Sequence, residues 1–276
     1  MNKSIRHTDV WLRLTFPIAI LLAIATTGGI FISNLYRDNP YFVAQAIGQD
    51  FVSLFVVLPT LVVSAFLASL DSPRARIIWL GTLIYLVYTY VVAAFDVNFN
   101  LLFLVYVALL GCSLYALIGG LVTANLSSVK ECFTEKIPVK AISIYLAVLG
   151  MLFYFLWLRE IIPALIAKEI PQSIQENGTP TNAVHVLDMA WILPAFGITA
   201  ISLWRKQALG YTLAGALLSY CVLLISAILA MAVYMTIRGY PVAVPQVVIF
   251  GTLFAISLGM LVWYMKGLST PLISTE

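Results

Sequence analysis

Charged residues are scarce in this sequence. Lys, Arg, Asp and Glu make up 10% of the 276 residues, whereas 62% are hydrophobic. A soluble globular domain carries about 25% charged residues, because its surface must face water. The chain is therefore too poor in polar groups to be a soluble enzyme or a nucleic-acid-binding domain. Its apolar runs also lack the alternating polarity of a transmembrane β-barrel.

Known catalytic motifs are missing as well. The sequence contains no HExxH, GxSxG, Walker or GxGxxG pattern, so zinc-protease, serine-hydrolase and nucleotide-driven mechanisms lack their characteristic residues. The last two apolar runs hold no central lysine, which excludes a retinal Schiff base. Three cysteines without a CxxC spacing predict neither a disulfide framework nor a redox motif. Whether the protein is an enzyme stays open at this point.

Long apolar runs, by contrast, are abundant. Each is close to the roughly 20 residues that a helix needs to cross a bilayer, and helices satisfy their own backbone hydrogen bonds in hydrocarbon. We therefore predict an all-α polytopic transmembrane helix bundle that forms a single integral membrane domain, residues 1–276. The eight predicted spans cover residues 11–35, 50–70, 77–95, 101–123, 140–160, 184–204, 209–236 and 243–265.

The basic residues predict the orientation of these spans. Eleven of the 15 Lys and Arg residues fall in the segments that share a side with the N-terminus, and the other four fall on the opposite side. Because cytoplasmic loops are enriched in Lys and Arg, both termini are predicted to be cytoplasmic. The lipid bilayer is the expected partner and nucleic acid is not. The sequence leaves the oligomeric state undetermined.

A weak internal repeat accompanies this topology. An offset of 135 residues aligns Asp50 with His185, Leu58-Pro59 with Leu193-Pro194, and Tyr85 with Tyr220. Each half would hold four spans and begin on the same side, so the repeat would be parallel. Transporters are often built from such halves, with the binding site at their interface.

Several polar residues gather near the outer ends of the predicted spans. Asp188 follows His185 by three residues and shares its helix face, and a carboxylate at this depth needs a partner. We expect Arg159 to be that partner, with His185 second. Together they predict a polar pocket that opens outward, and residues 158–181 form either a lid over it or a plain connector. The candidate ligand-binding or proton-relay residues are Asp50, Asp96, Arg159, Glu160, His185 and Asp188.

Two other interpretations of these residues remain open. They could form a purely structural network of ion pairs that ties the helix ends together. Alternatively, His185, Asp188 and Asp50 could hold a divalent metal such as zinc or manganese, although one His-x-x-Asp pair is a weak signal. No cofactor is otherwise predicted. The aromatic residues near the span ends, Trp157 among them, are interpreted as the interfacial belt of a membrane protein.

Three strings carry a family resemblance. They are Gly48-Gln49-Asp50, then Trp79-Leu80-Gly81 with the tyrosines that follow it, and the segment from Pro180 to Asp188. In these strings the chain resembles a family of uncharacterised prokaryotic multi-pass membrane proteins. The resemblance implies a bacterial or archaeal cytoplasmic membrane, and it implies no activity, substrate or catalytic residue.

Three functions are therefore carried forward. The favoured one is a transporter or binding protein for a small solute, with protons as the coupling ion or the ligand. The second is a membrane-embedded enzyme that acts on a lipid or lipid-linked substrate, whose head group the polar pocket would bind in the outer leaflet. The third is a structural or sensory membrane subunit without chemistry of its own. A polar path through the bundle would favour the first, a lateral opening the second, and a closed, fully paired network the third.

Overall fold

Every regular element of the described chain is a helix. The computed structural model describes residues 8–124, 130–133 and 137–268. Its helices are α1 (Thr8–Arg13), α2 (Thr15–Phe31), α3 (Pro40–Val52), η1 (Ser53–Val57), α4 (Leu58–Ser69), α5 (Pro73–Phe95), α6 (Phe103–Val122), α8 (Val139–Ala167), α9 (Gln172–Asn177), α10 (Ala183–Leu187), η2 (Asp188–Ile192), α11 (Leu193–Trp204), α12 (Ala208–Ile237) and α13 (Val244–Lys266).

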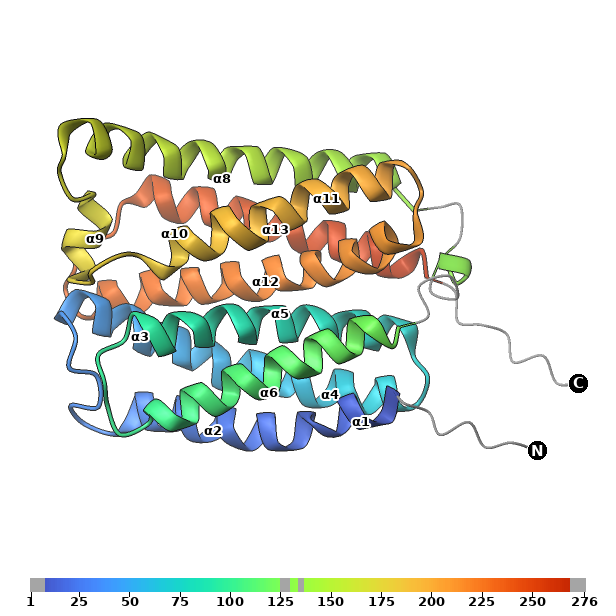
Figure 1. The fold of residues 1–276 in the computed structure, drawn as a ribbon, viewed down its shortest axis with the longest axis horizontal. Coiled ribbons are helices and arrows are strands. Elements are labelled where there is room, and N and C mark those ends of the chain that lie inside the picture. The colour runs from blue at the N-terminus through green and yellow to red at the C-terminus, as the bar shows by residue number, and fades with distance from the viewer. Residues whose placement is uncertain (1–7, 125–129, 134–136, 269–276) are drawn as a thin grey trace, which may run out of the picture.

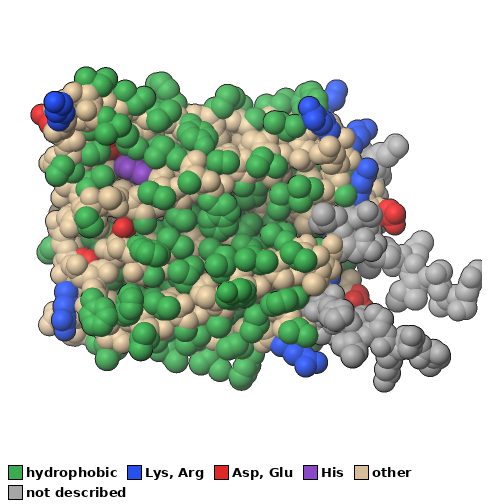
Figure 2. Space-filling view, in the orientation of Figure 1, with side chains coloured by type: hydrophobic (Ala, Val, Ile, Leu, Met, Phe, Trp, Pro, Cys, Tyr) green, Lys and Arg blue, Asp and Glu red, His purple; other side chains and the backbone are tan. Residues whose placement is uncertain are grey.

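These elements join into eight helical rods that are long and apolar enough to cross a membrane. Their outward side chains are hydrophobic along the length of the bundle, and the Lys and Arg side chains gather at its two ends (Figure 2). Aliphatic and aromatic side chains such as Phe16, Phe66 and Val262 are exposed there, as lipid contact allows. This is the architecture of a multi-pass membrane protein, and it confirms the predicted all-α bundle of eight spans.

The bundle has two distinct ends. We call the end at which α1 begins and α13 finishes the terminal end (Figure 1). The other end, which we call the loop end, carries the segments 32–39, 96–102, 168–182 and 238–243. Assignment of the terminal end to the cytoplasm remains the prediction made from the basic residues.

The predicted repeat corresponds to matching helix boundaries. η1 and η2 are both π-helices of five residues, and their start points lie 135 residues apart. The helices that follow them, α4 and α11, begin and end at the same offset, and so do the first residues of α5 and α12. The first half, α1 to α6, and the second half, α8 to α13, lie side by side in Figure 1.

A Leu-Pro pair accounts for each π-helix. Proline has no N–H, so the carbonyl four residues before it loses its helical donor. At both sites the preceding leucine N–H bonds five residues back instead: Leu58 to the Ser53 carbonyl, and Leu193 to the Asp188 carbonyl. Each span is widened by one residue at this point, a feature that is frequent at functional sites.

Two central helices join the halves. α5 packs along α12, and α3 of the first half also packs along α12. Gly48 makes the second contact close, because a methyl group there would meet the α12 backbone at Met231. α13 packs chiefly on α12 and is the least buried of the eight rods.

Two predicted span boundaries are wrong, and both corrections move polar residues. The second rod begins at Pro40, with an Asn39 cap, rather than at residue 50. Asp50 therefore lies about three helical turns inside its rod. The fifth rod runs on to Ala167 instead of ending at residue 160, so that Arg159 and Glu160 are also within a helix. In both cases a charged residue was taken as the end of a span, although the helix continues past it.

Candidate functional site

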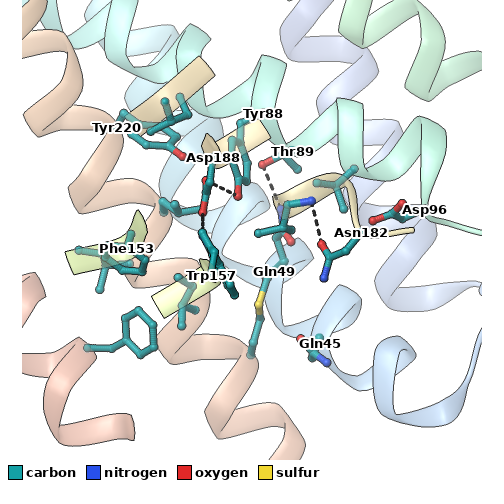
Figure 3. Close-up of a pocket in the computed structure, with 18 of the residues that line it drawn as sticks. Gln45, Gln49, Tyr88, Thr89, Asp96, Phe153, Trp157, Asn182, Asp188 and Tyr220 are labelled. Carbon is teal, nitrogen blue, oxygen red and sulfur yellow. Dashed lines mark hydrogen bonds between the residues drawn. The ribbon is translucent and has the colours of Figure 1, made fainter. Parts of the chain in front are cut away.

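A cavity of about 730 Å³ lies between the two halves. Its wall is built from α3, α5, α8, α10, η2, α11, α12 and α13, with single residues from α6 and α9. Figure 3 shows how these side chains converge from separate helices. Most of the lining is apolar, and the polar lining residues are Tyr36, Gln45, Gln49, Asp50, Tyr88, Thr89, Tyr90, Asp96, Tyr106, Trp157, Glu160, Asn177, Asn182, Asp188, Tyr220 and Gln246.

The cavity occupies the half of the bundle nearer the loop end. On α12 its lining starts at Tyr220, near the middle of the helix, and continues towards the loop end. On α8 it starts at Leu149, about a third of the way along the helix. Beyond that level Trp79, Tyr85 and Tyr264 fill the interior and are fully buried. The cavity lining therefore does not continue to the terminal end.

The cavity also reaches the lateral surface, between α8 and α13. Leu152 and Leu156 of α8 and Ile249 of α13 line the cavity and are also 45–55% exposed. Farther towards the terminal end the two helices are tied by a hydrogen bond of 2.6 Å between Tyr145 and Ser257. A molecule dissolved in the bilayer could therefore enter between α8 and α13, on the loop-end side of this hydrogen bond.

Asp188 is the first polar centre of the cavity. The Tyr88 hydroxyl donates to its Oδ1 at 3.0 Å, and the Trp157 indole Nε1 donates to its Oδ2 at 2.9 Å. The side chain is 7% exposed. The predicted partner Arg159 is therefore wrong, and so is the second choice, His185. Two neutral donors orient the carboxylate and leave its charge unpaired.

Tyr220 adds a polar group with no partner to this centre. Its ring packs edge-on against the Tyr88 ring, with centroids 5.7 Å apart, and its side chain is 1% exposed. Tyr220 lines the cavity, and its buried hydroxyl has no hydrogen-bond partner among the described residues. In the first half the equivalent Tyr85 bonds Ser53 at 3.0 Å. A buried hydroxyl without a partner is costly, so the two equivalent tyrosines differ in how well their hydroxyls are satisfied.

Asp50 is the second polar centre. The Tyr36 hydroxyl donates to its Oδ2 at 2.6 Å. Gly29 on α2 permits this contact, because a methyl group there would collide with the carboxylate. Burial and the nearby Asp50 hold the pKa of Tyr36 well above its usual value, so that this hydroxyl keeps its proton and stays a donor. Tyr106 of α6 also lines the cavity, and its hydroxyl is buried.

A hydrogen bond between α3 and α5 links the two centres. Gln49 Nε2 donates to Thr89 Oγ1 at 3.0 Å, as drawn in Figure 3. Gln49 is the chain neighbour of Asp50, and Thr89 is the chain neighbour of Tyr88, which donates to Asp188. The bond therefore joins α3 beside Asp50 to α5 beside the Asp188 donor Tyr88.

Asp96 has a structural role at the rim. Its Oδ2 accepts a hydrogen bond of 2.8 Å from the Ala183 N–H, in the first turn of α10. Asn182 caps the same turn by accepting from Val184 and His185. Partial burial raises the pKa of Asp96, and the bond from Ala183 opposes that rise. Asp96 thus fixes the start of the sixth rod and still adds a carboxyl to the cavity wall.

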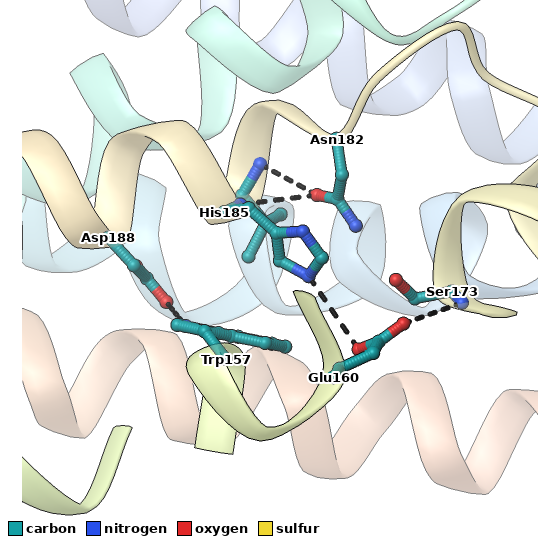
Figure 4. Close-up of polar contacts among 7 residues, drawn as sticks. Trp157, Glu160, Ser173, Asn182, His185 and Asp188 are labelled. Atoms are coloured by element: carbon teal, nitrogen blue, oxygen red, sulfur yellow. Dashed lines mark hydrogen bonds and ion pairs between the residues drawn. The ribbon is translucent and has the colours of Figure 1, made fainter. Parts of the chain in front are cut away.

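Glu160 and His185 meet at the edge of the site (Figure 4). Their closest side-chain atoms are 3.9 Å apart, and the His185 ring packs on Trp157 with centroids 4.6 Å apart. Glu160 Oε1 also accepts from the Ser173 N–H at 2.9 Å, which holds the start of α9. Residues 158–181 therefore continue α8 and then fold over the loop end, where Asn177 joins the cavity lining.

Four of the six predicted site residues line the cavity, and two do not. Asp50, Asp96, Glu160 and Asp188 are in its wall, whereas His185 contacts it only through Trp157 and Glu160. Arg159 is exposed and lies outside the cavity. The described residues contain no group of three or more His, Cys, Asp or Glu side chains that could hold a metal ion. The weak metal candidates His185, Asp188 and Asp50 are not assembled as a ligand set.

Sequence reasoning missed the residues that orient the carboxylates. Trp157 was grouped with the interfacial aromatic belt, although it lies three residues before Glu160 and thus on the same helix face. Gln45 and Gln49 are four residues apart on a segment placed outside the second span. Treating residues 40–50 as helical would have placed the two glutamines, four residues apart and thus on one helix face, in the same rod as Asp50.

No family model, curated protein or solved structure matches this sequence. The resemblance to a prokaryotic family is thus without support from these comparisons. The eight apolar helices alone carry the assignment as a multi-pass membrane protein.

Proposed function

We propose that the protein binds amphipathic organic cations, which enter its cavity from the bilayer. The ligand class follows from the cavity wall. Its described lining includes four carboxyl residues and no Lys or Arg. The unpaired Asp188 carboxylate carries this proposal, because a buried charge calls for a counter-ion.

Aromatic rings around Asp188 suit the same ligand. Trp157, Tyr88 and Tyr220 surround the carboxylate, and Phe153 and Phe250 face each other nearby with centroids 6.5 Å apart. Aromatic faces attract cations within about 6 Å of their centres, most strongly where water is excluded. A cation with an apolar body would contact Asp188 with its charge and the aliphatic wall with its remainder.

The volume and route agree with this ligand class. Pockets for drug-sized molecules span roughly 300–1,000 Å³, and this cavity has about 730 Å³. The exposed lining residues between α8 and α13 give access from the apolar side surface. A strongly hydrated solute would not gain from that route, whereas an amphipathic molecule concentrated in the bilayer would.

The other two functions fit the cavity less well. A lipid-processing enzyme would need a basic clamp for a phosphate head group, but Arg159 lies outside the cavity. A purely structural network would need neither a cavity of about 730 Å³ nor exposed lining residues between two helices, and the bundle has both.

Binding of tetraphenylphosphonium tests the proposal. We expect purified protein in nanodiscs to bind this cation well above the level of empty nanodiscs, and to discriminate against tetraphenylborate, an anion of the same shape. Asp188→Asn should weaken cation binding at least tenfold, which is about 1.4 kcal/mol, since the amide keeps the size of the side chain but not its charge.

The matched control is Glu169→Gln, which removes a carboxylate from an exposed position at the loop end outside the cavity. It should bind like the wild type. Equal binding of the cation and the anion, or an unchanged affinity in Asp188→Asn, would contradict the proposal.

A further inference from the structure

The cavity contains a second polar centre that the ligand at Asp188 does not use. Asp50 lies on α3, across the Gln49–Thr89 bridge from Asp188. It has one hydrogen-bond donor, Tyr36, and it faces the same enclosed space. A carboxylate in this position needs a positive charge or a proton.

The neighbours of Asp50 offer no fixed positive charge. Within the part of the chain that the structure describes, its titratable neighbours are tyrosines: Tyr36 in the segment before α3, Tyr85 and Tyr90 on α5, and Tyr106 on α6. α2 presents Gly29 to it, and α12 presents its own backbone to the adjacent turn of α3 at Gly48. Tyrosine hydroxyls donate hydrogen bonds but do not neutralise a carboxylate near neutral pH.

Both carboxyls line the same cavity and lie at similar depths. Tyr88 bonds Asp188, while Tyr90 is a neighbour of Tyr36 in the Asp50 centre. Two residues along α5 correspond to a rise of roughly 3 Å. A positive charge bound in this cavity therefore acts on both carboxyls, more strongly than it would in bulk water.

We infer that Asp50 is a proton-binding site whose proton is exchanged for the organic cation at Asp188. This inference rests on the proposed function. In the empty cavity the Asp50 carboxyl holds a proton. When the cation binds at Asp188, its positive charge favours the Asp50 carboxylate, and the proton leaves to solvent at the loop end. One positive charge replaces another, so the charge within the cavity stays constant and the exchange is balanced.

Release of a proton on ligand binding is the direct test. Tetraphenylphosphonium would be added to the full chain in weakly buffered nanodiscs between pH 5 and 8, and proton release would be read with a pH indicator. The wild type should release up to one proton per bound cation. Asp50→Asn should still bind the cation but release none, since an amide cannot lose this proton while its oxygen still accepts from Tyr36.

Two further variants sharpen the result. Tyr36→Phe removes the donor to Asp50, so the carboxyl should hold its proton more tightly and release should move to higher pH. Asp38→Asn removes a carboxyl that lies outside the cavity and accepts from the Asn98 N–H; release should match the wild type. If Asp50→Asn does not bind the cation, Tyr36→Phe provides the test instead. A pH profile of proton release in Tyr36→Phe that equals that of the wild type would overturn the inference.

The two proposals fail in different ways. If the wild type does not bind tetraphenylphosphonium, the proposed function is wrong. If it binds the cation but releases no proton, or if Asp50→Asn releases as much as the wild type, binding stands and the proton site is wrong.

Discussion

The two halves of the bundle share a four-rod plan but differ in how tightly their outer helices pack. In the first half α1 and α2 pack directly against α6. The Trp11 indole ring packs against Gly119, and the Leu102 side chain packs against Gly28. In the second half the equivalent helices, α8 and α13, do not pack closely, and the cavity opens laterally between them.

Side-chain size at equivalent positions accounts for this difference. The offset of 135 residues takes Gly119 to Phe254 and Gly28 to Pro163. Small residues let transmembrane helices approach closely, and neither of these glycines has a glycine counterpart on α8 or α13. The outer helices of the first half thus pack closely, and those of the second half leave the lateral opening of the cavity.

Closing the gap between α8 and α13 should have the largest effect. In a background without native cysteines, Phe153→Cys with Phe250→Cys would be joined by a short thiol cross-linker. Since the cation enters there, cross-linking should reduce tetraphenylphosphonium binding more than tenfold, measured by equilibrium binding in nanodiscs. The control pair Phe51→Cys with Tyr234→Cys joins rings 6.0 Å apart on α3 and α12. Equal losses in both pairs would contradict a lateral route.

Glycine-to-alanine substitutions should affect stability differently in the two halves of the bundle. Gly119→Ala places a methyl group against the Trp11 ring, and such overpacking lowers the free energy of unfolding by about 1–3 kcal/mol. Gly251→Ala, on α13, meets nothing within 4 Å. It should be neutral or stabilise by up to about 1 kcal/mol through helix propensity. Thermal unfolding of the two variants in the same detergent measures their Tm shifts. Equal shifts would contradict the difference in packing between the two halves.

The equivalent tyrosines Tyr85 and Tyr220 should respond in opposite ways. Tyr85→Phe loses the hydrogen bond to Ser53 and should cost about 1 kcal/mol of stability. Tyr220→Phe removes a buried hydroxyl that has no partner among the described residues, so stability should be unchanged or slightly higher. Binding of tetraphenylphosphonium should weaken several-fold in Tyr220→Phe only, since that hydroxyl faces the ligand. A stability loss in Tyr220→Phe equal to that in Tyr85→Phe would contradict the assignment.

The smallest expected effect is a pH dependence at Asp96. Burial raises the pKa of Asp96 above its ordinary value of 3.8, so the folded state favours the protonated form. Its contribution to stability is therefore greatest in acid and is lost as the pH rises through the raised pKa. Asp96→Asn still accepts from Ala183 and should show a smaller fall in Tm between pH 4 and 7 than the wild type. The exposed Glu169→Gln variant is the control and should show the same fall in Tm as the wild type. A fall in Asp96→Asn as steep as that of the wild type would contradict this role of Asp96.

Much of the fold follows from composition and periodicity. The eight rods are visible as apolar runs, and the repeat is visible in two Leu-Pro pairs, because proline chemistry acts on the local backbone. The start of α3 was missed, because Asp50 looked like a membrane boundary. In the structure its carboxyl lies in the cavity between the two halves instead of at the lipid interface.

The partners of Asp188 could not be predicted from the sequence. Tyr88 lies 100 residues away in the chain, and only the packing of α5 beside η2 brings it near. Arg159 and Glu160 point about 100° apart on α8, so only one of them can face the cavity. The rotation of α8 selects Glu160, and that rotation depends on tertiary contacts that a single sequence does not display.

The most direct test of a cation site at Asp188 is the position of a bound heavy-atom cation. Crystals soaked with tetraphenylarsonium would show the arsenic by anomalous scattering. The predicted result is one peak within the cavity, about 6 Å or less from the rings of Trp157 or Tyr220, which is lost in Asp188→Asn. A cavity without a peak, or a peak that persists in that variant, would contradict a cation site there.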